Sequence, residues 1–466
     1  AMRYVYEETS SLDERCYATF GLTPEILMEH AGVALARAVK KRLTRKKSAL
    51  FVCGMGNNGA DGIVAARMLH GAYTVSIYMP YELKSELAKL QLERAQKVGV
   101  VIVNELIDAD VYVDALFGAG LNRPLDKTTC QLIEALNAKE GYKIACDIPS
   151  GILSNLTLSP TVFKANETIT MGALKLGLFN DNVKDNVGKI NVANLGIARK
   201  QYEIPSTIML LQKSDLKLPF RDQKNSNKGS FGHVAIVQGS KEGAAHLSGM
   251  GAFHFGAGLV TLVGEKNKKL PEYLMNSRTL PKNANVIVAG MGLEMPFDEE
   301  AITSLLLGNT LPLVIDASLS HHPLITKAIT SKKPVVLTPH PKEFSSILEL
   351  LCKEKISVEA IQSNRFEHAK RFSLAFPHVV LLLKGANTII AHNGQLFINT
   401  YGTQALAKGG SGDVLAGMIG ALIAQGYSLK DAAIHASLAH ALVSSTFRGN
   451  NFAFTPIDIC KGLKWL

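Results

Sequence analysis

The chain has 466 residues, of which 47% are hydrophobic and 19% charged, so it is long enough for two globular cores and has no disordered or fibrous composition. Its formal net charge of +10 would suit nucleic-acid binding. The basic residues are scattered, however, and the one dense run, Lys40–Lys47, has the composition of the solvated end of a helix. We therefore expect no nucleic-acid partner and favour an anionic small molecule as substrate.

Six cysteines are spread along the chain without a C-x-x-C pair, which disfavours a disulfide framework and a zinc site. No uninterrupted apolar stretch reaches the roughly 18 residues that a membrane span requires, and the first residues lack a signal-peptide pattern. We expect a cytoplasmic protein with no membrane partner.

From residue 48 onward, short apolar runs alternate with helical segments. ALFVCG, TVSIYMP, VVIVN, ADVYVDALFG and YKIACDIPSG predict strands, and DGIVAARMLHGA, SELAKLQLERAQKVG and CQLIEALNAKE predict the helices between them. Such a pattern indicates a parallel sheet covered on both faces. Ligands bind these sheets at the carboxyl ends of the strands, where this chain carries GMGNNGADG, DALFGAG and DIPSG.

The stretch GMGNNGADG places two asparagines and an aspartate among glycines directly after a strand. Asn58 can offer a carbonyl oxygen to a hard cation. Asp61 can hold a ribose hydroxyl or cap the following helix, and the motif alone leaves both readings open.

Asp114 and Asp147 close two predicted strands of the same sheet. One carboxylate could donate and accept protons, and the other could join Asn58 and Ser150 in an oxygen-rich cation site. Alternatively, both could simply cap the turns that follow. Together with the Asn-Gly loop, the pair favours a functional role.

The alternation lapses into a polar, charged stretch around residues 198–230. We place a domain boundary near residue 205, which gives an N-terminal domain of residues 1–204 and a C-terminal domain of residues 205–466. A second alternation then runs through HVAIVQGS, GLVTLVG, ANVIVAGMGL, LPLVIDASLS, KPVVLTPHPKEF and VVLLLKGANTII. The predicted fold is α/β, with two doubly wound domains.

Near the C-terminus, the glycine-rich turn Gly409–Gly412 runs into an apolar helix that we expect to begin near Asp413. Such a turn directs backbone N–H groups and the positive end of the helix dipole at one point, which suits an anion. The alternative is an ordinary tight turn capped by Asp413. His340 and Lys384 also lie at predicted strand ends. Taken alone, His340 would be an ordinary turn residue and Lys384 a solvated surface lysine. A second glycine-containing turn follows Lys384, however, and this favours a functional role for the lysine.

The stretches LMEHAG, GMGNNGADG, DALFGAG and DIPSG resemble the N-terminal epimerase domain of the NAD(P)H-hydrate repair enzymes. NKGSFGHVAIVQGS, GAGLVT, TPHPKEF, LLKGANTII and LAKGGSGDVLAG resemble the ADP-dependent dehydratase domain of the same bifunctional family. The resemblance covers nearly the whole chain and implies a Rossmann-like first domain and a ribokinase-like second domain. Two positions depart from the family, which usually has glycine where Ala60 and Gln238 stand.

The substrate that this resemblance implies is NADH or NADPH carrying water across the C5–C6 double bond of the nicotinamide ring. The first domain would interconvert the R and S epimers at C6, and the second would dehydrate the S form with ADP and Mg²⁺. Beyond these small molecules, the expected partner is a second copy of the chain in a homo-oligomer. A small-molecule kinase is disfavoured by the fused GMGNNGADG domain, and a non-catalytic nucleotide sensor by the joint presence of Asp147, Asp413, Lys384 and His340.

The resemblance also implies roles for individual residues. In the first domain, Asp147 would be the acid/base, and a potassium ion would be held by Asn58, Asp114 and Ser150. The substrate would be bound by Asn57, Asn58, Gly59, Ala60, Asp61, Gly118, Ala119, Gly120, Leu121, Asn122, Arg123, Pro124 and Asp147. In the second domain, Asp413 would be the base that activates the C6 hydroxyl. The substrate would be bound there by Ala257, Gly292, His340 and Asp413, and the nucleotide by Lys384, Gly385, Ala386, Asn387, Thr388, Gly409, Gly410, Ser411 and Gly412.

Overall fold

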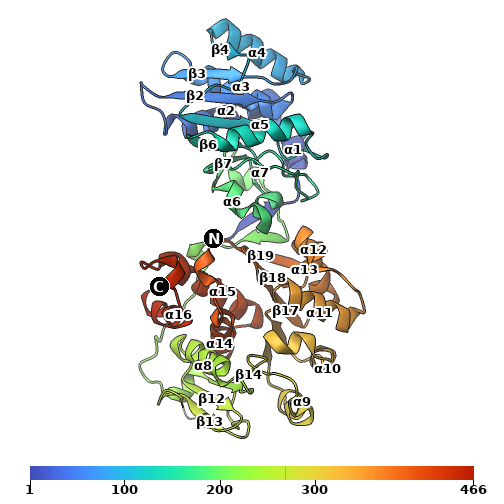
Figure 1. The fold of residues 1–466 in the computed structure, drawn as a ribbon, viewed down its shortest axis with the longest axis vertical. Helices are drawn as coiled ribbons and strands as arrows, with labels where there is room; N and C mark the ends of the chain where they lie inside the picture. The colour runs from blue at the N-terminus through green and yellow to red at the C-terminus, as the bar shows by residue number, and fades with distance from the viewer. Residues whose placement is uncertain (268) are drawn as a thin grey trace. The chain divides into compact units, whose positions relative to one another are not determined.

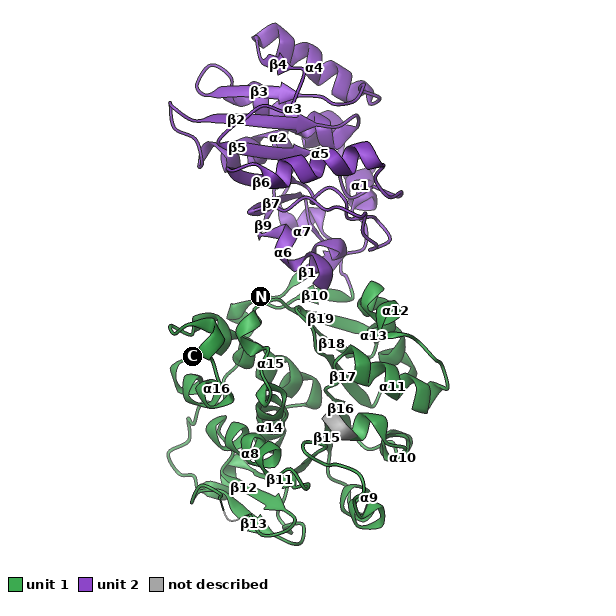
Figure 2. Ribbon diagram, in the orientation of Figure 1, with its two compact units in different colours: residues 1–3, 207–466 green, residues 4–206 purple. Residues whose placement is uncertain are grey.

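The computed structural model describes residues 1–267 and 269–466, apart from the side chains of residues 317 and 318 (Figure 1). The chain splits into two compact units, shown in Figure 2. The N-terminal unit is Tyr4–Ser206, and the C-terminal unit is Thr207–Leu466 together with Ala1–Arg3. No helix in residues 1–267 and 269–466 is both long enough and apolar enough to cross a membrane.

The elements of the first half of the chain are β1 (Arg3–Tyr6), α1 (Ser10–Phe20), α2 (Pro24–Lys40), β2 (Ser48–Cys53), α3 (Asn57–Leu69), β3 (Thr74–Tyr78), α4 (Glu86–Val98), β4 (Val101–Val103), β5 (Val111–Ala115), α5 (Lys127–Ala138), β6 (Tyr142–Cys146), β7 (Glu167–Met171), β8 (Leu174–Lys175), α6 (Lys184–Val187), β9 (Lys189–Ala193) and α7 (Arg199–Tyr202).

The N-terminal unit is built on a seven-stranded sheet in the order β4-β3-β2-β5-β6-β7-β9, with all neighbouring strands parallel. Successive residues of β2 enter opposite cores, because side chains alternate across a strand. Phe51 packs with residues of α2 and α3, whereas Leu50 and Val52 pack with residues of α5. The short strand β8 pairs in parallel with β1, so that Lys175 lies opposite Tyr6.

The elements of the second half are β10 (Ile208–Leu210), β11 (His233–Val237), α8 (Glu242–His254), β12 (Leu259–Val263), β13 (Met275–Ser277), β14 (Val286–Ala289), α9 (Glu299–Leu307), β15 (Leu313–Ile315), α10 (Leu324–Thr330), β16 (Val335–Leu337), α11 (Pro341–Cys352), α12 (Val358–Ser363), α13 (Arg365–Ala375), β17 (Val379–Leu383), β18 (Thr388–His392), β19 (Gln395–Asn399), α14 (Ser411–Ala424), α15 (Leu429–Thr446) and α16 (Pro456–Gly462).

The sheet of the C-terminal unit runs in the order β13-β12-β11-β14-β15-β16-β17-β18-β19-β10. It is parallel from β13 to β17, and β18 is antiparallel to both of its neighbours. Helix α14 packs closely on α8 and on the sheet because glycines lie where it meets them. A Cβ on Gly417 would lie 1.8 Å from the Ser248 carbonyl oxygen, and one on Gly420 would lie 2.6 Å from Val288 Cγ2.

In each sheet the chain adds strands outward on one side of a central strand and then crosses to its other side. The central strand is β2 in the N-terminal unit and β11 in the C-terminal unit, and the loops at this switch point touch each other. In the N-terminal unit a Cβ on Gly54, after β2, would lie 1.9 Å from the Leu116 carbonyl oxygen, after β5. In the C-terminal unit a Cβ on Gly239, after β11, would lie 2.3 Å from the Gly292 carbonyl oxygen, after β14. Switch points of open α/β sheets are where ligands bind. The predicted α/β class with two doubly wound domains is confirmed.

Candidate active sites

The glycine-rich loop after β2 enters α3 earlier than the sequence predicted. The helix begins at Asn57 with Gly56 as its N-cap, so Asp61 lies in the second turn, and the interpretation of Asp61 as the cap is wrong. Glycine is required at position 59, because a Cβ there would lie 2.1 Å from the Gly54 carbonyl oxygen. The loop therefore folds back tightly on itself and presents the start of α3 at the switch point.

Asn58 joins this loop to the end of β6. Its Nδ2 donates to the Cys146 carbonyl oxygen at 2.9 Å, and its Oδ1 is buried with no hydrogen-bond partner among the described residues. A Cβ on Gly118 would lie 3.3 Å from Asn58 Nδ2 and 3.4 Å from Asp147 Oδ2. The structure thus brings together Asn58, Gly118 and Asp147, which are far apart in the sequence.

Asp147 follows β6 directly and has a φ of 70°, in the left-handed region that residues other than glycine rarely adopt. Its Oδ2 accepts from the Ala119 N–H at 3.2 Å, and its Oδ1 lies 2.8 Å from the Lys175 ammonium. Burial raises the pKa of Asp147, but the Lys175 charge and the hydrogen bonds from Lys175, Met171 and Ala119 outweigh it, and the pKa lies below its usual range. Asp147 is therefore ionised at neutral pH.

Two further carboxylates, Asp61 and Asp13, interact with the charge of Asp147. Burial is the main cause that raises the pKa of Asp61 well above its usual range, and the neighbouring charges of Asp147 and Asp13 raise it further. Asp13 on α1 accepts a hydrogen bond from the Tyr202 hydroxyl at 2.8 Å, and burial raises its pKa as well. Pairs of carboxyl groups whose pKa values are driven apart are suited to acid and base roles. The sequence did not single out Asp13, Tyr202 or Lys175.

The two other predicted cation ligands, Asp114 and Ser150, contact each other. Ser150 Oγ donates to Asp114 Oδ1 at 2.7 Å, and the Ser150 N–H donates to Asp114 Oδ2 at 2.8 Å. Burial raises the pKa of Asp114 to about 6, although these hydrogen bonds act against it. Asp114 also accepts from the Leu116 N–H at 3.1 Å, so part of its role is to hold the turn after β5.

The remaining predicted contacts of this unit differ in exposure. Asn57 is exposed and accepts from the Ser85 hydroxyl, which caps α4. The Ala60 side chain is buried with Met28 and Val64, so only its backbone is left for a ligand. The segment after β5 is largely open to solvent at Gly120, Asn122, Arg123 and Pro124.

In the C-terminal unit the same edge of the sheet carries a lysine and two aspartates. Lys384, after β17, lies with its Nζ 3.0 Å from Asp316 Oδ1, and the Thr338 hydroxyl donates to the same oxygen at 2.7 Å. A Cβ on Gly412 would lie 2.8 Å from Lys384 Nζ. The structure therefore brings the Lys384 ammonium to the start of α14, next to Asp413. The residues predicted for this site from the sequence include neither Asp316 nor Thr338.

Helix α14 begins at Ser411 with Gly410 as its N-cap in the left-handed conformation, and no side chain caps it. The prediction that the helix begins near Asp413 was two residues late, and the reading of Asp413 as a cap is wrong. Burial raises the pKa of Asp413 to about 6, with a further rise from Asp316 and an opposing effect of Lys384. The carboxylate is thus available within the first turn rather than engaged by backbone N–H groups.

The predicted nucleotide loop, residues 385–387, is the turn between β17 and β18, and Thr388 begins β18. The buried Arg365 donates to the carbonyl oxygens of Leu383, Lys384 and Asn387 at 2.9–3.0 Å. These three hydrogen bonds fix the turn from the interior side. Arg365 lies at the start of α13 outside any recognisable motif, so nothing in the sequence indicates this role.

His340 is the N-cap of α11, and its ring and backbone form a reciprocal capping box with Glu343. Ala257 is buried in the core before β12, and Gly292 has a φ of 65° and packs on the Lys241 carbonyl oxygen. Gln238, the second departure from the family pattern, is buried, and its Nε2 donates to the Glu265 carbonyl oxygen at 2.8 Å. This side chain therefore ties the loop after β12 to the end of β11.

Comparison with known proteins covers both units. The family model for the YjeF-related protein N-terminus matches residues 24–177, and the model for NAD(P)H-hydrate dehydratase matches residues 234–464. The bifunctional NAD(P)H-hydrate repair enzyme of Helicobacter pylori is 43% identical over 100% of both chains. The chain belongs to this family of bifunctional NAD(P)H-hydrate repair enzymes. The predicted family and its two-part organisation are confirmed.

A more distant relative from the same family agrees. The bifunctional NAD(P)H-hydrate repair enzyme of Escherichia coli is 31% identical over 90% of this chain and 84% of its own. Among solved structures, the ADP/ATP-dependent NAD(P)H-hydrate dehydratase from Bacillus subtilis, co-crystallised with ATP and Mg²⁺, is 28% identical. It covers 53% of this chain and 92% of its own, with a TM-score of 0.47.

Proposed function

We propose that the N-terminal unit interconverts the R and S hydrates of NADH and NADPH at C6, and that the C-terminal unit dehydrates the S hydrate at the expense of ADP. The observation that carries this proposal is the 43% identity with a bifunctional NAD(P)H-hydrate repair enzyme over the whole length of both chains. The positive net charge and the glycine loops at both sheet edges suit a polyanionic dinucleotide.

Epimerisation needs a base that can also return a proton, and Asp147 fits this role. In the hydrate, C6 carries the hydroxyl and is bonded to the ring nitrogen. Removal of the hydroxyl proton forms the carbonyl and breaks the bond between C6 and nitrogen, and the nitrogen takes up the proton. Rotation and the reverse steps then close the ring with the opposite configuration. An ionised carboxylate at hydrogen-bond distance can carry the proton in both directions.

The potassium ion that the resemblance implies fits one feature of this chain: the buried Asn58 Oδ1, which has no hydrogen-bond partner among the described residues. We assign the ion to Asn58, Asp114 and Ser150, whose oxygens carry too little charge for a dedicated calcium site. When bound, potassium would supply positive charge at this site for the anionic substrate. No group of three or more His, Cys, Asp or Glu side chains suited to a metal occurs among residues 1–267 and 269–466.

In the C-terminal unit, Asp413 is the base for phosphoryl transfer. It takes the proton of the C6 hydroxyl as the oxygen attacks the terminal phosphoryl group of ADP, and AMP leaves. Phosphate then departs from C6 and a proton from C5, which restores the double bond. The N-terminus of α14 at Gly409–Gly412 and the Lys384 ammonium stabilise the transferred group, and Mg²⁺ accompanies the nucleotide phosphates.

The other residues of the two sites bind rather than react. In the N-terminal unit, Asn57, Gly59, Ala60 and the segment 118–124 would contact the dinucleotide. In the C-terminal unit, the backbone at Ala257 and Gly292 and the half-exposed His340 would contact the hydrate, and the turn from Gly385 to Thr388 would contact ADP. We assign epimerisation to residues 1–204 and dehydration to residues 205–466. Assembly into a homo-oligomer and a cytoplasmic location stay predictions, which light scattering and cell fractionation test.

The test uses the purified R and S hydrates separately, each with and without ADP and Mg²⁺. We expect the S hydrate with ADP to yield NADH, AMP and phosphate without a lag, and the R hydrate to do so only after a lag for epimerisation. Without ADP, the epimers interconvert but no NADH appears. A stable phosphorylated product without NADH would identify a kinase, and binding without turnover would identify a sensor.

A further inference from the structure

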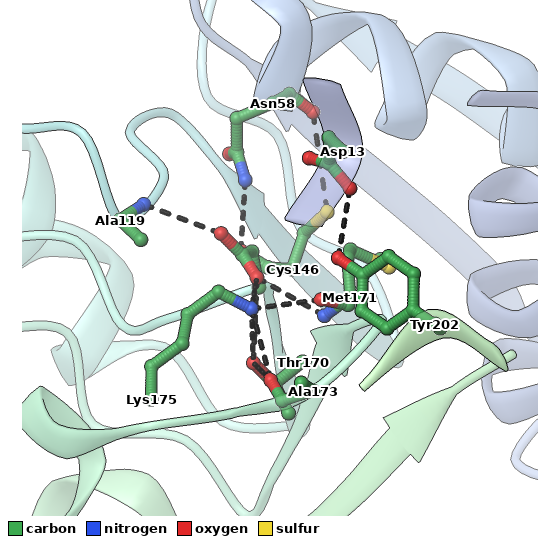
Figure 3. Close-up of polar contacts among 10 residues, drawn as sticks. Asp13, Asn58, Ala119, Cys146, Thr170, Met171, Ala173, Lys175 and Tyr202 are labelled. Atoms are coloured by element: carbon green, nitrogen blue, oxygen red, sulfur yellow. Dashed lines mark hydrogen bonds and ion pairs between the residues drawn. The ribbon is translucent and has the colours of Figure 1, made fainter. Parts of the chain in front are cut away.

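The Lys175 ammonium is buried against the aspartate of the N-terminal site. Its side chain is 5% exposed, and its Nζ lies 2.8 Å from Asp147 Oδ1. It also donates to the carbonyl oxygens of Met171 and Ala173 at 2.8 and 3.1 Å and to the Thr170 hydroxyl at 3.0 Å. Figure 3 shows the amine enclosed by these three residues. Burying a lysine is costly unless it is paired, so this arrangement needs the negative charge of Asp147.

The two oxygens of Asp147 have different surroundings. Oδ1 is held by the Lys175 ammonium, by the Met171 N–H at 3.0 Å and by the Thr170 hydroxyl at 3.3 Å. Oδ2 accepts a single bond, from the Ala119 N–H, and lies on the side of Gly118, where a Cβ would be 3.4 Å away. One oxygen is thus occupied by the protein interior, and the other lies at the loop that follows β5.

We propose that Lys175 is the positioning residue of the epimerase site: it holds Asp147 Oδ1 against β7 and β8, so that Oδ2 alone exchanges the proton with the hydrate. The inference rests on the proposed epimerisation and adds a division of labour within one carboxylate. Lys175 does not itself exchange the proton with substrate, because its three N–H bonds already face four protein acceptors.

The negative charges around Asp147 explain why it needs the positive charge of Lys175 beside it. Asp61 on α3 and Asp13 on α1 are carboxylates that interact with it, while Tyr202 on α7 and Cys146 on β6 add further groups that would be negative if ionised. Lys175 on β8 is the cation in contact with Asp147 among the residues that the structure describes. Without it, burial and like charges would favour the protonated form of Asp147, which cannot accept a proton.

The test is the Lys175→Met variant of the full-length chain, with Lys164→Met as the matched control because Lys164 is exposed in the same unit. The rate from purified R to S hydrate is measured from pH 5 to pH 9, with dehydration of S hydrate by the same preparation as the reference. Loss of a correctly ionised base costs on the order of a hundredfold in rate, and we expect such a loss below pH 7 in Lys175→Met. The rate should recover as the pH rises and on addition of methylammonium.

A loss of equal size at every pH, without rescue by methylammonium, would mean a purely structural role and would overturn the proposal, as would an unchanged rate. Thr170→Val provides a second test that does not depend on folding of the first variant. It removes a hydroxyl that touches both Lys175 and Asp147, and we expect its epimerisation to decline with falling pH at a higher pH than in wild type. An unshifted profile would contradict the proposal. If wild type and Lys164→Met both fail to epimerise while dehydrating S hydrate, the proposed function itself fails.

Discussion

The two candidate sites each place an aspartate at the edge of a sheet, and in the proposed function each aspartate accepts a hydroxyl proton, but the charges around the two aspartates differ. In the N-terminal unit a lysine pairs with that aspartate directly: Lys175 Nζ lies 2.8 Å from Asp147. In the C-terminal unit the lysine pairs instead with a neighbour, since Lys384 Nζ lies 3.0 Å from Asp316. Among the residues that the structure describes, Asp413 forms no ion pair, although the Lys384 charge still lowers its pKa. The pKa of Asp147 is accordingly lowered, whereas burial and Asp316 raise that of Asp413 to about 6.

This difference suits the two reactions. In the proposed epimerisation a proton moves out and back, so the base must be ionised when the hydrate binds and must be able to return the proton that it accepts. Phosphoryl transfer brings a polyanion next to the base, so Lys384 is more useful if it is free to turn from Asp316 to the phosphates than if it is committed to Asp413. The two sites thus differ in which aspartate the ammonium pairs with, and this difference fits the two proposed reactions.

The largest change in rate is expected when the proposed base of one site is removed, because one activity should be lost while the other is kept. Asp147→Asn and Asp413→Asn keep the size of the side chain but remove the base, and we expect each to slow its own reaction by about a hundred- to ten-thousandfold. Asp147→Asn should leave dehydration of S hydrate intact, and Asp413→Asn should leave epimerisation and ADP affinity nearly unchanged. Each variant is the control of the other, measured with purified epimers.

Loss of S-hydrate dehydration in a folded Asp147→Asn protein would refute the assignment of two independent sites. Near wild-type dehydration by Asp413→Asn would reduce Asp413 to a structural residue of the first turn of α14.

The second prediction concerns pH and needs no substitution. Dehydration should fall as the pH drops through about 6, where Asp413 takes up its proton, and the decline should approach tenfold per pH unit below that value. Epimerisation should persist over the same range, because the pKa of Asp147 lies below its usual value. Both rates are followed in one buffer series with potassium present. A parallel decline of the two reactions would contradict the electrostatic difference.

How far the sequence predicts these sites depends on what surrounds each residue. Asn58, Asp147 and Asp413 lie in or next to glycine-rich turns, where backbone geometry and polar side chains give a visible pattern. Asp316 comes directly after the apolar run LVI, as Asp114 comes after VYV, so the sequence holds the same signal for both. Lys175 lies in a two-residue strand within an apolar stretch, and its proximity to Asp147 arises only from the pairing of distant segments.

The first residue of a helix was predicted least well where a glycine-rich turn precedes the helix. Both α3 and α14 begin before the aspartate that the sequence suggested as cap, at Asn57 and Ser411. In each case a glycine is the N-cap residue. The aspartate therefore lies within the helix rather than at its cap. The parallel sheets were predicted because apolar runs and helical segments alternate throughout, and that pattern depends on many residues rather than one.

The Asp316→Asn substitution removes the ion-pair partner of Lys384. Asp316→Asn eliminates a charge that raises the pKa of Asp413 and weakens the anchor of the ammonium. The acidic decline of dehydration should therefore move to lower pH, with a loss of about tenfold at neutral pH from the lost charge-assisted hydrogen bond. Glu300→Gln, an exposed change on α9, is the charge-matched control. A decline that moves to higher pH would show that Asp316 does not act on Asp413 as its position suggests.

The smallest expected effect concerns the cation. Replacement of potassium by tetramethylammonium, which is too large for a site lined by Asn58, Asp114 and Ser150, should lower the rate of epimerisation several-fold. Dehydration should stay the same, since Lys384 and the N-terminus of α14 supply positive charge in that site without an added monovalent ion. Asn58→Ala removes the buried Oδ1 that has no partner and should make epimerisation insensitive to the exchange. If epimerisation by wild type were indifferent to potassium, or if dehydration responded instead, the assignment of the cation to the N-terminal unit would be wrong.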